Sequence, residues 1–284
     1  MSGLIEPYFY PKKRDGIFQR TLFIAPETAA VVSNSIGDQI SVAANILHRD
    51  RTIISSYTEE FLQYLSLCRP LMQIFTAKNH NAFYDNLLEF EEIKTDTLIK
   101  TESFSSLTMP EALMASIIER SGIDPDRHFP IHTMRHSRFL ENLQHNHFTE
   151  LIHLPDIQTL RDGKVKIAMS TMLNTGVVSY TIEEYIIHLK QIIALLESYK
   201  NYHIILTDGS QNDQYTIYAR EELGVLVAKT SQPAIVLFMK ESNLSAAFWD
   251  FLKNIVNKKA YTDSDNKSAI AHLSNYLKKL TNEV

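Results

Sequence analysis

The stretch that decides the fold is Tyr180–Val256, YTIEEYIIHLKQIIALLESYKNYHIILTDGSQNDQYTIYAREELGVLVAKTSQPAIVLFMKESNLSAAFWDFLKNIV. An apolar stripe at helical spacing predicts a long helix over Ile182–Tyr199. Short apolar, β-branched runs predict strands over Tyr202–Leu206, Tyr215–Arg220, Gly224–Lys229 and Ala234–Met239. A helix over Leu244–Val256, which carries the single tryptophan, closes what we interpret as one continuous α/β unit.

Composition bounds the class of protein. The 284 residues suffice for one large domain or two ordinary ones, and a hydrophobic fraction of 44% is that of a globular core. A net charge of −5 does not favour a nucleic-acid-binding surface. Cys68 is the only cysteine, which excludes an intrachain disulfide and a cysteine-based zinc site. The sequence has no signal-peptide pattern and no apolar run near the roughly 18–20 residues of a membrane span, so a cytoplasmic protein is expected.

The remaining chain contains a looser α/β pattern, so we expect an α/β (or α+β) protein of two possibly related lobes. Their sheets are expected to be mixed and flanked by helices. The expected segments are an N-terminal arm (1–16), a first lobe (17–123), a second lobe (124–256), and a C-terminal loop and helix (257–284). Within the first lobe the pattern predicts a helix over Thr28–Ile36 and an edge strand over Thr97–Ser103.

A short repeat raises the possibility of duplication. Ser56-Tyr57-Thr58-x-Glu60 recurs as Ser179-Tyr180-Thr181-x-Glu183, and each copy is expected to begin a helix that leads to a strand. Because Ser, Thr and Glu are also general helix-capping residues, both a duplication and a chance match remain open. A duplication predicts a groove between two similar lobes, which is a common ligand location.

Histidines are concentrated in one region. Six of the eleven are His128, His132, His136, His145, His147 and His153. His132 and His136 are four residues apart on a predicted helix, as paired metal ligands are, which would suit metal-assisted hydrolysis. The zinc-protease pattern His-Glu-x-x-His is absent, and a polar helix face bearing histidines is the alternative interpretation.

Catalytic signatures are otherwise missing. His188-x-Lys190 begins like the phospholipase D motif, but the required aspartate is replaced by Leu195 and the pair lies within a helix. We therefore expect His188 and Lys190 on the exposed side of that helix. The sequence contains no Gly-x-Ser-x-Gly elbow, Walker A motif or Gly-x-Gly-x-x-Gly loop.

Two loops and one aromatic residue are candidate ligand contacts. Asp208, Ser210 and Asn212 follow a predicted strand, where α/β folds often place ligands, although a hydrophilic turn explains them equally. Glu241, Ser242 and Asn243 precede the final helix of the unit, where Ser242 or Asn243 can cap the helix or its N-terminus can bind an anion. Trp249 is either a core anchor or part of a pocket or dimer face.

The words "YHIILTDGS", "YTIYAREELGVLVAKTSQPAIVLFMKESNLSAAFWDFL", "TELIHLPDI" and "SYTIEEYIIHL" carry a resemblance. The region of residues 15–256 resembles the C-terminal sensory region of bacterial helix-turn-helix (XRE-type) transcriptional regulators. The strand order also resembles catalytically inactive phospholipase D-like regulatory domains. The resemblance implies a preceding helix-turn-helix, but residues 1–51 contain none. The resemblance therefore leads us to expect either a piece of a longer regulator or a stand-alone relative, and direct nucleic-acid binding by this chain is not expected.

These observations lead to one principal hypothesis and two alternatives. The principal hypothesis is a non-enzymatic sensory or regulatory module that binds a small molecule or protein partner, without cofactor or membrane, and forms a homo-oligomer. The first alternative is a metal-dependent hydrolase that uses the histidine cluster of residues 128–153. The second is a structural subunit of a larger assembly.

Overall fold

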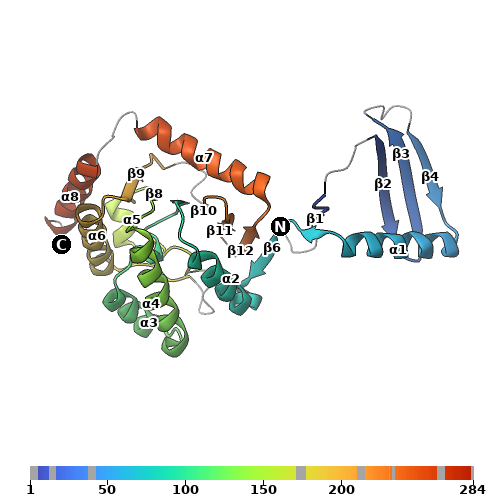
Figure 1. The fold of residues 1–284 in the computed structure, drawn as a ribbon. Coiled ribbons are helices and arrows are strands. Elements are labelled where there is room, and N and C mark those ends of the chain that lie inside the picture. Colours follow the sequence, from blue (N-terminus) through green and yellow to red (C-terminus); the bar gives the residue numbers. More distant parts are fainter. Residues whose placement is uncertain are drawn as a thin grey trace. The chain divides into compact units, whose positions relative to one another are not determined.

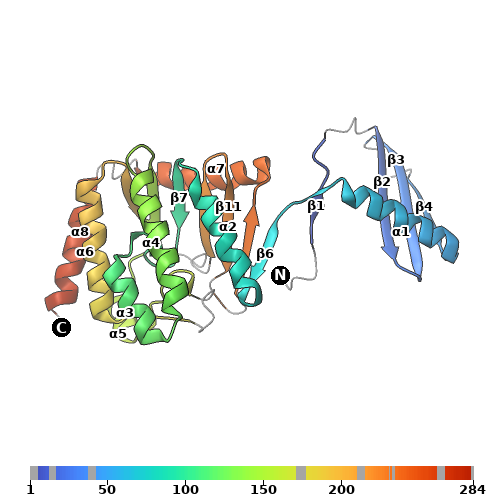
Figure 2. The same ribbon diagram turned by 60° about the horizontal axis from the view of Figure 1, so that its bottom comes forward.

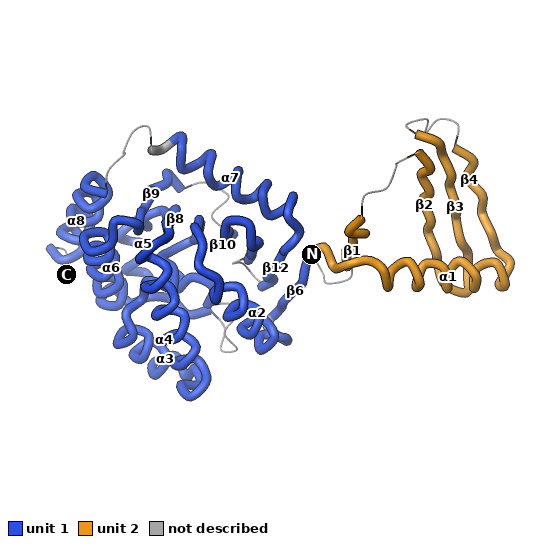
Figure 3. Tube along the Cα trace, in the orientation of Figure 1, with its two compact units in different colours: residues 1, 72–284 blue, residues 2–71 orange. Residues whose placement is uncertain are grey.

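The chain divides into two compact units, which Figure 3 colours separately. The computed structural model describes residues 6–12, 17–37, 43–170, 177–209, 215–229, 231, 234–260 and 266–282. Unit 2 contains residues 2–71, and unit 1 contains residues 72–284. The predicted arm (1–16) falls in unit 2, and the predicted boundary at residue 123 falls inside unit 1.

Unit 2 is a small sheet with one long helix. Strands β2 (Phe18–Ala25), β3 (Ala29–Ile36) and β4 (Ala44–His48) form an antiparallel sheet, and β1 (Tyr8–Phe9) pairs with β5 (Arg69–Pro70). Helix α1 (Arg51–Ser66) packs on one face of the sheet, where Arg20 of β2 forms an ion pair with Glu60.

The helix predicted over Thr28–Ile36 is wrong, because this segment is strand β3. Pro26 and Glu27 begin a hairpin turn rather than a helix. Glu27 has φ 64°, a left-handed conformation suited to a tight turn, and the Thr28 amide donates to the Ala25 carbonyl oxygen at 3.0 Å. The β-branched pair Val31 and Val32 then favours the strand.

The helix start expected at Ser56-Tyr57-Thr58 is also wrong. Helix α1 begins at Arg51 with Asp50 as its N-cap, whose side chain accepts from the amides of Thr52 and Ile53. Thr58 lies inside α1, and its hydroxyl donates to the Ile54 carbonyl oxygen at 2.8 Å. Its counterpart Thr181, in contrast, is the N-cap of α6 (Ile182–Ser198). The two matching segments, Ser56–Glu60 and Ser179–Glu183, therefore occupy different structural positions.

Unit 1 is organised around a seven-stranded mixed sheet in the order β6-β12-β11-β10-β7-β8-β9. Strands β7, β8 and β9 run parallel, and each of the other pairings is antiparallel. The strands are β6 (Gln73–Thr76), β7 (Thr97–Lys100), β8 (Phe148–Ile152), β9 (Tyr202–Leu206), β10 (Tyr215–Arg220), β11 (Gly224–Lys229) and β12 (Ile235–Met239). The α/β fold class, with a mixed sheet flanked by helices, is confirmed.

Strand β7 is central, not the predicted edge strand. It pairs with β10 on one side and β8 on the other, and all four of its residues are buried. The polar residues Thr97 and Lys100 suggested an exposed edge, but they are held within the core. Through β7, one sheet joins strands from both predicted lobes.

Helices cover both faces of this sheet unequally (Figures 1 and 2). Helix α7 (Ser242–Ala260) covers one face, where Leu252 packs with Leu98 and Val225. The larger core lies on the other face, beneath helices from the rest of the unit. These are α2 (His80–Glu92), α3 (Glu111–Ser121), α4 (Pro125–Asn142), α5 (Ile157–Arg161), α6 and α8 (Asn266–Asn282), with short 3-10 turns η2 (Ala77–Asn79) and η3 (Ser106–Thr108).

Thr181 sets the start of α6 through a capping box. Its hydroxyl oxygen accepts from the Glu184 amide at 3.2 Å, and the Glu184 carboxylate accepts from the Thr181 amide at 2.9 Å. Glu184 also binds Arg120 of α3 with two contacts of 2.8 Å. The cap therefore positions the carboxylate that connects α6 to α3.

We expect Thr181→Ala to lower the free energy of unfolding of unit 1 by about 1 kcal/mol, because the Glu184 amide loses its acceptor. Chemical denaturation followed by circular dichroism measures the change. Thr281→Ala is the matched control, since that exposed hydroxyl donates only to carbonyl oxygens of its own helix. Equal losses in the two variants would contradict a capping role.

Candidate functional site

Unit 1 contains an irregular segment, residues 101–109, that is buried although it follows a strand as a loop does. The Thr108 and Met109 side chains are fully buried. Buried loops are uncommon because their main-chain polar groups need partners away from water. Here side chains from α4, α6 and β8 supply several of those partners. The buried residues are Thr101, Ser103, Phe104, Ser105, Leu107, Thr108 and Met109.

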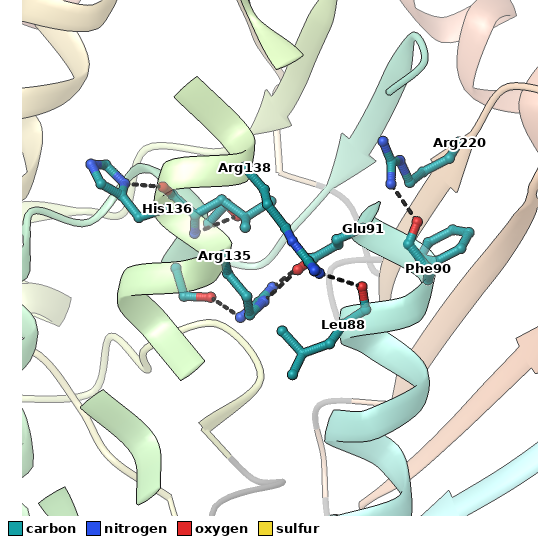
Figure 4. A network of polar contacts seen from close by, with 10 residues as sticks. Leu88, Phe90, Glu91, Arg135, His136, Arg138 and Arg220 are labelled. Atoms are coloured by element: carbon teal, nitrogen blue, oxygen red, sulfur yellow. Dashed lines mark hydrogen bonds and ion pairs between the residues drawn. The ribbon is translucent and has the colours of Figure 1, made fainter. Parts of the chain in front are cut away.

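The histidine pair of α4 binds this segment. His132 Nε2 lies 3.1 Å from the Met109 carbonyl oxygen, and His136 Nδ1 lies 2.7 Å from the Leu107 carbonyl oxygen (His136 is labelled in Figure 4). Since a carbonyl oxygen only accepts, each ring donates an N–H. His132 and His136, four residues apart on α4, therefore bind two carbonyl groups that are two residues apart on segment 101–109.

Helix α4 begins at Pro125, almost two turns before His132. Asp124 is the N-cap, with its carboxylate accepting from the Asp126 amide at 3.1 Å, and Pro125 occupies the first turn. This start places His128 on the same helix as His132. Burial, followed by electrostatic interaction with Arg135 and His136, lowers the pKa of His132 to about 4, so its ring is neutral at pH 7.

An ion pair connects α4 to α2 beside the histidines. Arg135 binds Glu91 through two hydrogen bonds, Nε to Oε2 at 2.7 Å and Nη2 to Oε1 at 2.8 Å (Figure 4). Its Nη1 donates to Ser106 Oγ at 3.3 Å. Burial disfavours the charged guanidinium, but the adjacent Glu91 carboxylate raises the pKa of Arg135 overall. Positive and negative charge therefore cancel within the pair.

Two more arginines bind the C-terminal turn of α2. Arg138 donates to the Leu88 carbonyl oxygen at 2.6 Å, and Arg220 of β10 donates to the Phe90 carbonyl oxygen (Figure 4). Cations at a helix C-terminus stabilise its unpaired carbonyl groups and dipole. These contacts hold α2 against α4 and the sheet.

A hydrogen-bonded chain connects the segment to α6. His188 lies between Tyr180 and Thr108, with Nδ1 2.8 Å from the tyrosine oxygen and Nε2 3.0 Å from Thr108 Oγ1. Because the Thr108 hydroxyl donates to the Ser105 carbonyl oxygen at 2.8 Å, His188 donates through Nε2 and accepts the Tyr180 proton at Nδ1. Burial lowers the pKa of His188 to about 3, which agrees with this neutral ring.

The expected exposure of His188 is therefore wrong, although Lys190 is exposed as expected. The polar character of histidine suggested the solvent side of the helix. Its position, however, coincides with the buried stripe of α6, where Tyr185, Leu189 and Ile192 are fully buried.

Glu150 on β8 is the fully buried acid of this region. Its Oε1 accepts from the Ser105 amide at 2.6 Å, and its Oε2 accepts from the Tyr202 hydroxyl at 2.8 Å. Burial raises the pKa of Glu150 to about 7, despite these two hydrogen bonds, which favour the charged form. Glu150 therefore anchors the 101–109 segment to β8 and β9 with a carboxyl group that is partly protonated near neutral pH.

A cavity of about 70 Å³ lies between α2, α3 and α4, beside His132 and Arg135. Apolar side chains from the three helices form most of its wall. Polar groups are supplied by Ser106, His132, Arg135 and their neighbours. The lining residues are Phe83, Tyr84, Leu87, Ser106, Met114, Ile117, Ile118, Ile123, His128, Ile131, His132, Arg135 and the run from Ile167 to Ser170.

The two loops predicted as ligand contacts follow strands that lie far apart in the sheet and run in opposite directions. Asp208 follows β9, which runs parallel to β7, whereas Glu241 follows β12, which runs in the opposite direction. Four strands separate β12 from β9, a lateral distance of roughly 24 Å. The structure therefore does not bring Asp208 and Glu241 together, and Ser210 and Asn212 lie outside the described residues.

Glu241 caps helix α7, not Ser242 or Asn243 as expected. Its carboxylate accepts from the Leu244 amide at 2.8 Å and from the Asn243 side chain at 3.1 Å. Ser242 and Asn243 are exposed in the first turn. Trp249 is half-buried and packs with the smaller core between α7 and the sheet.

The described residues contain no group of three or more His, Cys, Asp or Glu side chains arranged to hold a metal ion. Of the predicted pair, His132 lines the cavity and both rings donate to main-chain oxygens. The cavity itself was missed in the sequence. Its lining residues belong to apolar stripes of separate helices, each of which has the pattern of an ordinary core.

No protein-family model and no curated protein matches the sequence. Among solved structures the chain is similar to TrmBL2, an archaeal chromatin protein with a novel mode of DNA binding, at a TM-score of 0.35 and 11% identity. The match covers 72% of this chain and 60% of that chain, and the structural similarity is weak. No helix in the described part of the chain is long and apolar enough to cross a membrane.

Glu150 makes a testable contribution to pH dependence. Its pKa rises from 4.5 in the unfolded chain to about 7 in the fold, so the folded state binds the proton more tightly. The associated stability is present in full below about pH 4.5 and is lost as the pH rises through about 7. A shift of this size corresponds to on the order of 3 kcal/mol.

We therefore expect Glu150→Gln, which resembles the protonated acid, to gain stability relative to the wild type as the pH rises from about 5 to about 8. The difference between variants is the relevant measurement, because His132 and His188 titrate with the opposite sign. Thermal unfolding across this pH range measures it. Glu197→Gln, on the exposed side of α6, controls for the loss of one negative charge. A difference that does not vary with pH would contradict the assignment.

Proposed function

We propose that unit 1 is a non-enzymatic sensory module of a transcriptional regulator, and that it binds a small uncharged molecule in the cavity between α2, α3 and α4. The observation that carries the proposal is a cavity with a largely apolar wall and a few polar groups, in which the charged lining residue Arg135 is paired with Glu91. Ligand sites in proteins are typically apolar pockets with a few convergent polar groups. The link to transcription is supported by the sequence resemblance to sensory regions of XRE-type regulators.

The size of the cavity limits the ligand. A buried water occupies roughly 10–15 Å³ on the same measure, so about 70 Å³ accommodates several water-sized groups. That volume suits a compact molecule with on the order of six non-hydrogen atoms. Larger metabolites such as nucleotides do not fit without movement of the walls.

The charge state of the lining favours a neutral ligand. His132, with a pKa of about 4, is neutral at pH 7, and burial lowers the pKa of His128 as well. Burial raises the pKa of Tyr84 to about 12, so its phenol stays protonated. The positive charge of Arg135 is balanced by Glu91. A charged ligand entering this site would lose its hydration without gaining an opposite charge.

One hydrogen-bonding group on the ligand has a suitable partner. Because His132 uses Nε2–H for the Met109 carbonyl oxygen, its Nδ1 retains an unshared electron pair that accepts a proton donor. A hydroxyl group on an otherwise apolar ligand matches this acceptor. The low pKa of the same ring makes it a poor general base at neutral pH, which favours binding over catalysis.

Backbone strain in the wall is consistent with a ligand site. Met169, which lines the cavity, has φ 59°, a left-handed conformation that is unfavourable for a residue with a side chain. Such strained residues are found preferentially at ligand-binding and switch regions. The same wall is joined through His132 and Arg135 to the 101–109 segment, so occupancy would act on the centre of unit 1.

Thermal shift assays with phenol and cyclohexanol, compared with benzoate and benzylamine, test the proposal. We expect the two neutral alcohols at about ten times their Kd to add roughly 1.4 kcal/mol, and the two charged probes to add nothing. That stabilisation raises the Tm by about 3–5 °C for a unit of this size.

The variant Ala168→Leu fills the cavity from its wall and should abolish the shift with phenol. Ala112→Leu, which adds the same volume at an exposed position of α3, should leave the shift unchanged. The absence of any shift with the neutral probes, or an equal shift in Ala168→Leu, would overturn this assignment of the site.

A further inference from the structure

The three-stranded sheet of unit 2 has two different faces. Side chains on a strand alternate between faces, and directly paired residues share a face. Arg20 contacts Glu60 and Tyr57 of α1, and its neighbours Leu22 and Ile24 are half-buried. The face that contains these side chains is therefore the one covered by α1, and it includes the buried Ala30 and Val32 of β3.

The other face, which we call the open face, has an apolar row across its centre. Phe23 pairs with Val31, and Val31 pairs with Leu47, so the three side chains lie side by side on adjacent strands. Their exposed fractions are 68%, 36% and 53%. Burial of such a row removes a large apolar surface from water, which is the main source of association free energy.

No charged residue lies on the open face of the described strands. The remaining residues that alternate onto it are small or uncharged: Gln19, Thr21, Ala25, Ala29, Ser33, Ser35 and Asn45. The solvent-facing side of an antiparallel sheet is normally polar. An uncharged face with a central apolar row has the composition of an interface core.

Unit 2 also has little core of its own. Of its described residues, only Ala30, Val32 and Ile54 are buried apolar side chains. A unit of this size with so few buried groups falls short of the apolar burial that compact domains need. Burial of the open face against another surface would supply part of the missing area.

We propose that the open face packs against the open face of a second copy of this chain, forming a symmetric dimer through Phe23, Val31 and Leu47. A twofold interface must be complementary to itself, and an uncharged surface meets its own copy without like-charge repulsion. Two sheets packed in this way bring their inner side chains into one layer about 10 Å thick.

The size of the face sets the expected strength. Three strands of up to eight residues span roughly 14 by 26 Å. The area of the open face, roughly 360 Å², is smaller than the roughly 800 Å² that each partner contributes to a stable interface. We therefore expect a weak dimer, with a Kd in the micromolar range.

Analytical ultracentrifugation of the full chain, from about 1 µM to about 200 µM, tests the proposal. We expect a reversible monomer–dimer equilibrium, and Phe23→Glu should weaken it by at least about tenfold, since it buries a charge at the interface. Phe18→Glu is the matched control: Phe18 is on the same strand and 77% exposed, but its position alternates onto the opposite face. It should leave the equilibrium unchanged.

A mixing experiment identifies the occupant as a second copy. At a concentration at which the wild type is largely dimeric, Val31→Glu and Val31→Lys should each be largely monomeric alone and should associate with each other when mixed. Val31 is at the centre of the row and lies nearest the twofold axis of a dimer centred on it, so opposite charges face each other there. A wild-type chain that stays monomeric at every concentration would overturn the proposal. So would a dimer that is unaffected by Phe23→Glu, or the absence of association in the mixture.

Discussion

Unit 1 depends on the burial of segment 101–109, whose polar groups are satisfied by side chains from three surrounding elements. His132 and His136 bind two of its carbonyl groups, His188 reaches its Thr108 hydroxyl, and Glu150 accepts from its Ser105 amide. An unsatisfied main-chain group in this environment would cost about 1–3 kcal/mol. The candidate metal ligands His132 and His136 thus have a structural role. They supply hydrogen bonds that water would otherwise make to the main chain of the segment.

The same arrangement explains why the cavity is neutral. Of the ionisable groups in the cavity wall, His132 is neutral because burial lowers its pKa to about 4, and Arg135 is paired with Glu91. A charged side chain is costly in a protein interior unless it is paired with an opposite charge or becomes neutral. The described wall of the cavity therefore presents no unpaired charge, which restricts the proposed ligand to neutral molecules.

The sequence predicted the regular parts of the fold and missed those decided by tertiary contacts. The strands Tyr215–Arg220 and Gly224–Lys229 and helix α6 follow directly from period and apolar runs. The run Thr52-Ile53-Ile54 is β-branched and by local propensity favours a strand, but it lies in helix α1, whose N-cap is Asp50. The helical spacing of His132 and His136 predicted a shared face, but the carbonyl groups they bind lie 23 and 29 residues away in the chain.

The hydrogen bonds of segment 101–109 also affect folding during biosynthesis. Its hydrogen-bond partners are synthesised later than the segment itself: Glu150 follows Ser105 by 45 residues, and His188 follows Thr108 by 80. Contacts so distant along the chain slow folding, because the loop between them must close first. During translation, strand β7 and segment 101–109 therefore lack their native partners until most of unit 1 has left the ribosome.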